Sequence, residues 1–312
     1  MTLSRKTSQC PVCRRTGHLI LDLQDESYGT RFALHACTAC KVGYTYPCPT
    51  DEELRKIYSG EYWARETTLE KRGGLARRIQ SFNNIRLAMM IRPLVNKLDP
   101  GMSILEVGCG SGHLAAYLSK CGFEVEVTDI DESILEEIDT RHAIKGYCGD
   151  LTQIDFMRNY HAVIFNNVLE HLPSPGRALE IAAGLLHENG VIFIEVPNIN
   201  SYQFKVFKAH WFHLVIPQHL YHFSAEALDT LASRFSLHRI WQSTFSPKTS
   251  AAGYAASLSP VLQPANLRKN WSKAMIFIYL GLQVMALPLV GLETVLGRGA
   301  VLRVLYQKKR TD

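Results

Sequence analysis

Three glycines at alternate positions, Gly108, Gly110 and Gly112, separate an apolar run from a helical pattern in the stretch ILEVGCGSGHLAAYL. The apolar run over residues 102–107 predicts a buried strand, and the pattern after the glycines predicts a helix that ends near Gly122. Glycine permits a positive φ and lets a ligand approach the backbone without a Cβ in the way. The spacing therefore predicts a strand-to-helix turn that holds a ligand. A tight turn with no ligand is the alternative.

Acidic residues lie at the ends of three successive apolar runs around this turn. Glu106 precedes the first glycine by two residues, Asp129 ends FEVEVTD, and Asp150 ends IKGYCGD. Strands of an open α/β sheet bind ligands at their carboxyl ends, where an acid can bind both ribose hydroxyls. The glycine spacing matches neither the dinucleotide fingerprint G-x-G-x-x-G nor the P-loop. A crevice lined with carboxylates favours a cationic nucleoside, and S-adenosylmethionine has the sulfonium, the amino group and the ribose diol.

Short apolar runs alternate with helical patterns over residues 102–245, which predicts a parallel sheet with helices on both faces. The 312 residues, of which 46% are hydrophobic and 20% charged, can form a globular protein with a substantial core. The predicted strands are 102–107, 123–128, 144–148, 161–166, 190–196 and 235–242.

Four motifs in order, LEVGCGSGHL, VTDID, CGDL and FNNVLEHLPSP, resemble those of class I S-adenosylmethionine-dependent methyltransferases. The resemblance covers roughly residues 55–245 and the last strand. It implies a Rossmann-like α/β fold, a seven-stranded sheet with an antiparallel last strand and helices on both faces. It also implies that Glu106 and the glycine backbone hold the methionine end, that Asp129 binds the ribose and that Asp150 faces the adenine. The cofactor residues implied are Glu106, Gly108, Gly110, Gly112, Asp129, Ile130, Asp150, Leu151 and Asn166.

Paired cysteines near the beginning of the sequence have the spacing of a metal site. Cys10, Cys13, Cys37 and Cys40 form C-x2-C-x23-C-x2-C, and four thiolates in two knuckles are a closed, structural set for Zn²⁺. Zinc would supply the folding energy of so small a ribbon. Disulfides or a chance pattern are the alternatives. No secretory signal is evident, so the eight cysteines favour a reducing compartment and a cytoplasmic location.

The charge distribution indicates which class of molecule accepts the methyl group. Residues 1–50 carry a net charge of +3 and residues 298–312 carry +4, which leaves about −2 on the remaining body. A nucleic-acid enzyme would require a broader basic face. The combination of a zinc ribbon with such a domain resembles sugar and natural-product methyltransferases. It also resembles a ribosomal-RNA methyltransferase family, and Arg14 and Arg15 beside the second cysteine leave RNA binding open as an alternative. The charge favours the first group, and hence a small-molecule, sugar or lipid-linked acceptor.

The motif NNVLEHL places Glu170 and His171 just after the fourth predicted strand. It resembles the E-x-x-E-H motif of ubiquinone-pathway O-methyltransferases, which binds a divalent ion, but Asn167 replaces the first acid. His171 is therefore a candidate general base, because its ordinary pKa lies near neutral pH. The alternative is a histidine that fixes the loop by hydrogen bonds.

Four further histidines lie in HWFHLVIPQHLYHFS, at positions 210, 213, 219 and 222. The aromatic residues among them favour a segment that covers the acceptor over a metal site. We take His219 as a second candidate base and His222 as a lid residue, and Ser224 as the cap of the next helix. Tyr58, Tyr62 and Trp63 are predicted to form the lid on the other side.

Residues 274–297 are apolar on every helical face, and about twenty such residues can span a bilayer. A single crossing would leave the predicted last strand on the wrong side of the membrane. Pro288 instead suggests two short helices in a hairpin. With its basic flanks, this insert predicts either contact with an anionic membrane surface, at the inner face of the membrane, or a buried hairpin or dimer contact.

These patterns predict four regions and one activity. The regions are a zinc ribbon (1–50), a helical lid or linker (51–98), a methyltransferase domain (99–250 and 298–312) and a hydrophobic helical insert (251–297). The activity is methyl transfer from S-adenosylmethionine to an oxygen or carbon. RNA-base methylation and a catalytically silent membrane-associated protein are the alternatives.

Overall fold

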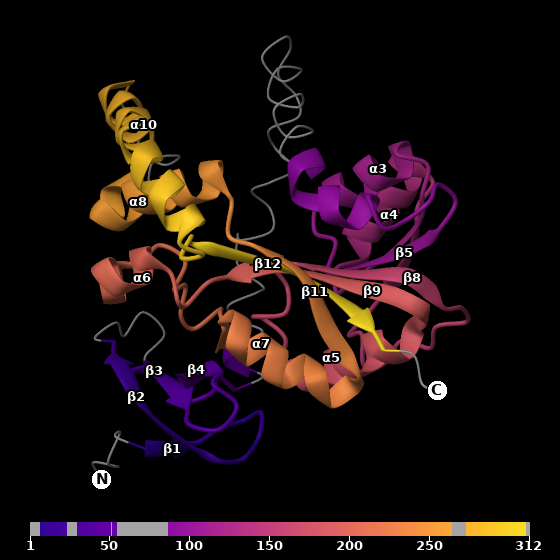
Figure 1. Ribbon diagram of the computed structural model, residues 1–312, viewed down its shortest axis with the longest axis horizontal. Coiled ribbons are helices and arrows are strands. Elements are labelled where there is room, and N and C mark those ends of the chain that lie inside the picture. Colours follow the sequence, from indigo (N-terminus) through magenta and orange to yellow (C-terminus); the bar gives the residue numbers. More distant parts are fainter. Residues whose placement is uncertain (1–6, 24–29, 51, 55–86, 264–272, 310–312) are drawn as a thin grey trace.

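The computed structural model describes residues 7–23, 30–50, 52–54, 87–263 and 273–309. Its centre is a seven-stranded sheet in the order β11-β12-β9-β8-β5-β6-β7 (Figure 1). Strand β12 is antiparallel to both of its neighbours, whereas β5 to β9 run parallel. The strands are β5 (Ser103–Val107), β6 (Glu124–Asp129), β7 (Lys145–Cys148), β8 (Tyr160–Asn166), β9 (Leu186–Pro197), β11 (Leu237–Ser243) and β12 (Val301–Lys308). The predicted Rossmann-like sheet with its antiparallel last strand is confirmed, and each predicted strand is present.

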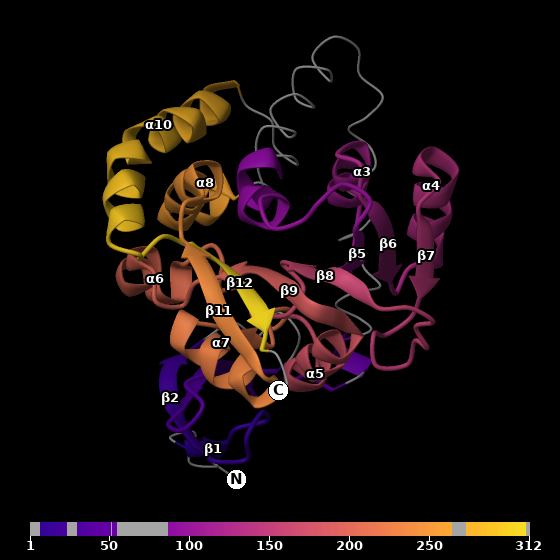
Figure 2. The same cartoon turned by 45° about the vertical axis from the view of Figure 1, so that its right-hand side comes forward.

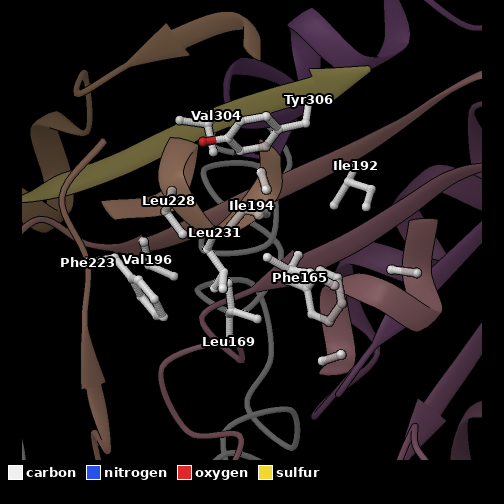
Figure 3. Close-up of a cluster of buried hydrophobic side chains, with 14 of the residues drawn as sticks. Phe165, Leu169, Ile192, Ile194, Val196, Phe223, Leu228, Leu231, Val304 and Tyr306 are labelled. Carbon is white, nitrogen blue, oxygen red and sulfur yellow. The ribbon is translucent and has the colours of Figure 1, made fainter. Parts of the chain in front are cut away.

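Helices cover both faces of this sheet because its central strands are apolar on both sides. Along β8, Ala162 and Ile164 join one apolar cluster, and Val163 and Phe165 join the other. Figure 3 shows the second cluster, formed by side chains of β8, β9, β12 and α7. The first face packs on residues 87–95, α3 (His113–Lys120) and α4 (Glu132–His142), and the second packs on α5 (Pro175–Leu185) and α7 (Ala225–Ala232). Both faces are therefore core, and only the strand ends are left to form a site.

A second, antiparallel sheet holds the cysteine pairs and has the order β1-β2-β3-β4-β10. Its first four strands are β1 (Thr7–Gln9), β2 (Thr16–Asp22), β3 (Ala33–Cys37) and β4 (Gly43–Tyr46). The fifth, β10 (Tyr221–His222), comes from the histidine-rich segment of the large domain and pairs with β4. The sequence analysis predicts a ribbon within residues 1–50. The cysteine spacing does not indicate that a strand from a distant part of the chain covers the open edge of this sheet.

The remaining helices gather at one end of the large sheet (Figures 1 and 2). They are α6 (Tyr202–Phe207), η3 (Lys208–His210), α8 (Pro247–Leu258), η5 (Pro260–Leu262) and α10 (Lys273–Val295). The short helix η4 (Ser233–Phe235) instead follows α7 and packs on α5 and β11. The predicted hairpin at Pro288 is wrong, because α10 is one helix with this proline inside it. Figure 2 shows that α10 is bent. Proline leaves one helical carbonyl without its donor and bends a helix without ending it.

The region predicted as a helical lid or linker is described only in part. Residues 52–54 and 87–95 are helical, and Leu87, Met90, Ile91 and Leu94 are buried against the large sheet. The proposed lid residues Tyr58, Tyr62 and Trp63 lie outside the described residues.

Candidate functional site

The three glycines of the turn between β5 and α3 all have positive φ, at 65°, 48° and 68° for Gly108, Gly110 and Gly112. A Cβ on Gly108 would lie 2.8 Å from a methyl carbon of Val168, and one on Gly112 would lie 2.6 Å from Ile138. Both glycines are therefore required by packing as well as by the backbone conformation. The contact with Val168 also places this turn directly against the segment after β8.

Asp129, at the carboxyl end of β6, is bound to the glycine turn. One carboxylate oxygen, Oδ2, accepts the Gly110 N–H at 2.9 Å, and Oδ1 accepts the N–H of Asp131 at 3.1 Å. The backbone carbonyl of Asp129 accepts the Gly149 N–H at 2.9 Å, which connects the ends of β6 and β7. The two bonds to the carboxylate orient it at the carboxyl end of β6, where the sequence predicts that the ribose binds.

Glu106 is only 2% exposed, and its Oε2 has no hydrogen-bond partner among the described residues. Burial raises the pKa of this carboxyl to about 8, and the nearby charge of Asp129 adds to the shift. A buried carboxyl oxygen without a donor is costly unless a ligand supplies one. The position fits the ammonium end of S-adenosylmethionine, which carries the positive charge and the N–H donors that this oxygen lacks.

The other predicted cofactor residues surround the same strand ends. Ile130 is 63% exposed, which suits the flat face of an adenine. Asp150 Oδ1 accepts both the N–H of Thr152, at 2.7 Å, and its hydroxyl, at 2.6 Å. Leu151 is buried in the core, so its side chain packs against the protein. Asn166 ends β8, and its Oδ1 accepts an N–H from the side chain of Asn167 at 3.1 Å.

The segment after β8 brings Glu170 and His171 together with His219. One possible ligand atom from each of these residues lies within 4.8 Å of the others, and the two imidazole rings are 4.7 Å apart. Glu170 is 1% exposed, and burial raises its pKa to about 8. Neither of its carboxyl oxygens has a hydrogen-bond partner among the described residues. Carboxyl and imidazole groups this close can hold a divalent ion or can handle a proton.

Backbone carbonyls set the tautomer of both imidazoles in this cluster. The Nδ1 of His171 lies 3.1 Å from the Gln218 carbonyl, and the Nδ1 of His219 lies 3.0 Å from the His213 carbonyl. A carbonyl can only accept, so each Nδ1 carries the hydrogen and each Nε2 carries the lone pair. Burial lowers the pKa of His171 to about 4 and that of His219 well below its ordinary value. Both rings are therefore neutral bases at neutral pH.

Asn167 has a structural reason to be an amide at the position of the first acid in E-x-x-E-H. Its Nδ2 donates to Glu195 Oε1 at 3.2 Å, and its backbone N–H donates to the Glu195 carbonyl at 2.8 Å. Glu195, on β9, is also ion-paired with Arg303 of β12. A glutamate at position 167 would place a second carboxylate beside a buried one. The sequence gave no signal for this Glu195 contact.

The second histidine cluster does not converge on one point. His210 is exposed on η3, His213 is half-buried, and His219 and His222 are buried. The predicted lid residue His222 lies in β10 against Gly43, whose Cβ would be 3.1 Å from the His222 Cβ. Ser224 caps α7 as predicted, since its hydroxyl accepts the Ala227 N–H at 3.2 Å.

Hydrogen bonds join the ribbon to this histidine segment. The Thr45 hydroxyl donates to the His219 carbonyl at 2.7 Å, and the Thr45 N–H donates to the Leu220 carbonyl at 2.9 Å. The N–H groups of Leu220 and Tyr221 both donate to the Glu170 carbonyl, at 2.9 and 3.1 Å. Strand β4 therefore holds His219 against the Glu170–His171 turn. Sequence reasoning missed Thr45, because nothing in its spacing distinguishes it from an ordinary strand residue.

The four predicted metal cysteines meet in one place. Their sulfur atoms all lie within 4.8 Å of one another, with Cys10 and Cys40 3.6 Å apart and Cys13 and Cys37 3.4 Å apart. Tetrahedral Zn²⁺ with bonds of about 2.3 Å places its sulfurs about 3.8 Å apart. The Cys37 sulfur also accepts the N–H groups of Ala39 and Cys40, both at 3.4 Å. This donor set fits a structural zinc ion, and the disulfide alternative is absent from the structure.

The family comparison decides what kind of domain this is. The family model described as "Methyltransferase domain" matches residues 79–238, about half of the chain. The chain belongs to this family. The methyltransferase domain has the class I fold, and its family and geometry agree with S-adenosylmethionine as the methyl donor.

Individual relatives agree with the family but are distant. The chain is 24% identical over 166 residues to a ubiquinone biosynthesis O-methyltransferase of Caulobacter vibrioides, and the match covers 48% of this chain and 63% of that protein. It is 28% identical over 156 residues to the protein of the same name from Coxiella burnetii, covering 47% and 62%. The match therefore spans less than two thirds of these relatives.

Solved structures with similar folds include further methyltransferases. Magnesium protoporphyrin IX methyltransferase from Synechocystis, with bound S-adenosylhomocysteine, has a TM-score of 0.49 and 17% identity, and the match covers 62% of this chain and 92% of that one. Phosphoethanolamine N-methyltransferase 2 from Haemonchus contortus, in complex with S-adenosylmethionine, has a TM-score of 0.49 and 16% identity, covering 73% and 53%.

Proposed function

We propose that this protein transfers a methyl group from S-adenosylmethionine to an oxygen or a carbon of a small-molecule acceptor. The observation that carries the proposal is the contact between two predicted motifs. Gly108 of the glycine turn packs on Val168, two residues before Glu170 and three before His171. The proposed cofactor site and the Glu170–His171–His219 cluster are therefore neighbours, as methyl transfer requires.

The cofactor residues act by binding and orientation. Glu106 meets the amino group, Asp129 accepts from the ribose hydroxyls, and Ile130 and Asp150 flank the adenine. Asn166 and the backbone of Gly110, Gly112 and Leu151 complete the pocket. S-adenosylmethionine, when bound, supplies an electrophilic methyl group. The protein contributes mainly position, which can account for much of the rate of a two-reactant step.

His171 is the proposed general base, with His219 as the second candidate. Its Nε2 lone pair would accept the proton of an acceptor hydroxyl as the oxygen forms its bond to the methyl carbon and the carbon–sulfur bond breaks. The Gln218 carbonyl would hold the resulting imidazolium through Nδ1–H. Glu170 lies next to His171 and, with a pKa of about 8, is mostly protonated at neutral pH. If it lost its proton, its negative charge would stabilise the imidazolium of His171. A general base contributes about 10²- to 10⁴-fold in rate, and most when its pKa lies near the working pH. Because burial lowers the pKa of His171 to about 4, we expect its contribution at the lower end of this range.

Zinc in the cysteine site is proposed to be structural. Four thiolates leave no open position for a substrate or for water. The purified protein is expected to contain one zinc ion per chain, measured by elemental analysis. Replacement of Cys10 by serine should release the metal and unfold the ribbon, because binding supplies the folding energy of such units. Full ribbon stability without metal would contradict the assignment.

The acceptor is proposed to be a sugar or a lipid-linked glycan intermediate, used on the cytoplasmic side of a membrane. The charge distribution, with its nearly neutral main body, supports an acceptor other than nucleic acid. The names of the relatives favour a second candidate, a hydroxyl on an apolar ring such as a quinone precursor. The exposed apolar helix α10 suits either acceptor if it is carried in a lipid phase.

Release of S-adenosylhomocysteine from a panel of sugar nucleotides, lipid-linked sugars and phenols tests this function. His171→Gln should lower kcat at least a hundredfold while S-adenosylmethionine affinity, measured by calorimetry, stays the same. His210→Gln, on an exposed residue of η3, is the matched control. Activity that is lost with EDTA and restored by a divalent cation would identify Glu170, His171 and His219 as ion ligands instead. No binding of S-adenosylmethionine at all would refute the proposal.

A further inference from the structure

Helix α10 leaves an unusually large apolar surface uncovered. Only one stripe of the helix is buried, formed by Ala286, Val290 and Glu293. These residues have the helical spacing expected for packing on α8. The opposite faces expose large side chains, with Phe277 at 74% and Met285 at 75%. The exposed large apolar residues of the helix are Phe277, Ile278, Leu280, Val284, Met285, Leu287, Leu289, Leu292 and Val295. Contiguous apolar surface of this kind marks a site for a partner or a membrane.

The apolar surface continues beyond α10. Val206 on α6 is 69% exposed, and Leu258 at the end of α8 and Val261 in η5 are exposed as well. These helices lie together at one end of the molecule in both views (Figures 1 and 2). Several separate segments of the chain therefore contribute to one exposed apolar end.

Positive charge accompanies this surface, and exposed negative charge does not. Helices α6, η3, α8 and α10 contain four lysines in their sequences and a single acid, Glu293. Lys205 and Lys208 are exposed on either side of Val206, and each ammonium lies over an aromatic ring, of Tyr202 and Phe204 respectively.

The single acid is turned inward. Glu293 is 1% exposed, accepts from the Tyr254 hydroxyl at 3.0 Å and from Gln203 Nε2 at 3.3 Å, and so fastens α10 to α8 and α6. The outer surface of this helix group therefore combines apolar side chains with lysines, without a carboxylate.

The connections of α10 exclude a single crossing of a bilayer. A helix of 23 residues is about 34 Å long, enough to span. However, α10 is flanked in the chain by two strands of the large sheet. Helix α8, which follows β11, packs on α10, and β12 follows α10, so both ends of α10 stay with this sheet. At the C-terminal end, Tyr202 N–H donates to the Arg298 carbonyl at 3.0 Å, and Asn198 Nδ2 donates to the Gly299 carbonyl at 2.9 Å. The helix can only lie in a membrane surface or dip into one leaflet.

We propose that α10 and α6 form a docking face for an anionic lipid bilayer, with the apolar side chains of α10 in the acyl region and Lys205 and Lys208 at the headgroups. A partner protein would be expected to meet the lysines with carboxylates of its own, but the length and uninterrupted apolar surface of α10 match lipid chains better. This proposal does not depend on the methyl-transfer chemistry.

Flotation of the full-length protein with lipid vesicles tests the docking face. The protein should float with vesicles of phosphatidylglycerol and phosphatidylcholine, and much less with phosphatidylcholine alone or at high salt. Lys205→Glu with Lys208→Glu should weaken binding about tenfold or more. Lys97→Glu with Lys120→Glu, at exposed sites outside the helices α6, α8 and α10, makes the same change in net charge and should leave binding unchanged.

A second pair of variants tests the apolar contact. Phe277→Ser with Met285→Ser should abolish flotation, whereas Met157→Ser, at another highly exposed apolar site, should not. Calorimetry with S-adenosylmethionine on each variant checks that the fold is intact and separates this proposal from the proposed function. Failure of the wild-type protein to bind anionic vesicles would overturn the proposal. So would a stable dimer in light scattering that Phe277→Ser with Met285→Ser dissociates, because a second copy would then cover the face.

Discussion

The hydroxyl of Thr45, in the sheet that holds the cysteine pairs, donates a hydrogen bond of 2.7 Å to the backbone carbonyl of His219, in the methyltransferase domain. This bond lies within a continuous path from the cysteine knuckles to the candidate base. Cys37 is in β3, β3 pairs with β4, and β4 carries Thr45. From His219 the path continues through the Leu220 N–H to the carbonyl of Glu170. The ribbon sheet is thus hydrogen-bonded directly to the segment that carries His219.

Thr45→Val should therefore affect chemistry more than cofactor binding. The buried His219 carbonyl loses its donor, at a cost of about 1 to 3 kcal/mol, and His219 becomes less well positioned. We expect a several-fold fall in kcat with an unchanged Kd for S-adenosylmethionine. Thr38→Val is the control, because Thr38 makes the same kind of bond, to the Thr16 carbonyl at 2.9 Å, wholly within the ribbon. Equal effects of the two substitutions on kcat would show that only ribbon stability matters.

Asp129→Ala should weaken the binding of S-adenosylmethionine by about 30- to 100-fold, because about 2 to 3 kcal/mol of ribose hydrogen bonding is lost. Calorimetry measures this directly. Asp131→Ala serves as the comparison, since Asp131 only caps α4 by accepting the Ser133 N–H at 3.0 Å. Loss of this helix cap should lower the free energy of unfolding by about 1 kcal/mol and leave the affinity for S-adenosylmethionine unchanged. An unchanged affinity in Asp129→Ala would refute the ribose assignment.

Asn167→Glu completes the E-x-x-E-H motif in sequence but should not do so in structure. The new carboxylate would lie beside Glu195, which is buried and already paired with Arg303. We expect unfolding in denaturant to become easier by about 1 to 3 kcal/mol, without tight binding of a divalent ion. Asn167→Gln keeps the amide donor and should cost less. If Asn167→Glu were as stable as the wild type and bound Mg²⁺ or Mn²⁺, the account of Asn167 given by its Glu195 contact would be wrong.

Local patterns in the sequence were sufficient for the large sheet and for the strand ends that carry Glu106, Asp129 and Asp150. Those features depend on runs of a few residues, such as apolar strands and glycines that require positive φ. The cysteine spacing likewise predicted four sulfurs that meet. In each case the physical cause lies within one short segment of the chain.

The features that sequence reasoning missed all join distant segments. Strand β10 completes the ribbon sheet, Thr45 holds His219, and Glu195 explains Asn167. No local pattern encodes such pairs. The hairpin predicted at Pro288 failed for a related reason, because whether a proline ends a helix or only bends it depends on how the flanking turns are held in the fold, and here Glu293 fastens α10 to its neighbours.

In mild acid, His213 should lower the free energy of unfolding by a definable amount. Burial lowers the pKa of His213 to about 4, whereas in the unfolded chain it titrates near 6.5. Below pH 6.5 the unfolded state therefore takes up a proton that the folded state refuses, so the free energy of unfolding decreases as pH falls from 6.5 to 4. Linkage gives a loss of about 3 kcal/mol for this residue across that range. His219 and His222, whose pKa values are also lowered by burial, act in the same direction. Glu106 and Glu170, whose pKa values burial raises to about 8, act in the opposite direction, so the His213 contribution is measured as a difference between variant and wild type.

His213→Gln removes the titrating group while keeping a polar side chain near Gln203 and Gly253, which border this position. The free energy of unfolding is measured in urea from pH 8 to pH 4. Above pH 7 the variant and the wild type should differ by a constant amount. Between pH 7 and pH 4 the wild type should lose about 3 kcal/mol more than the variant. His210→Gln, three residues earlier and exposed, should follow the wild-type curve throughout. Parallel curves for His213→Gln and the wild type down to pH 4 would show that His213 is protonated in the folded protein as readily as in the unfolded chain. A His213 imidazole that stays neutral in the folded protein in mild acid would then be ruled out.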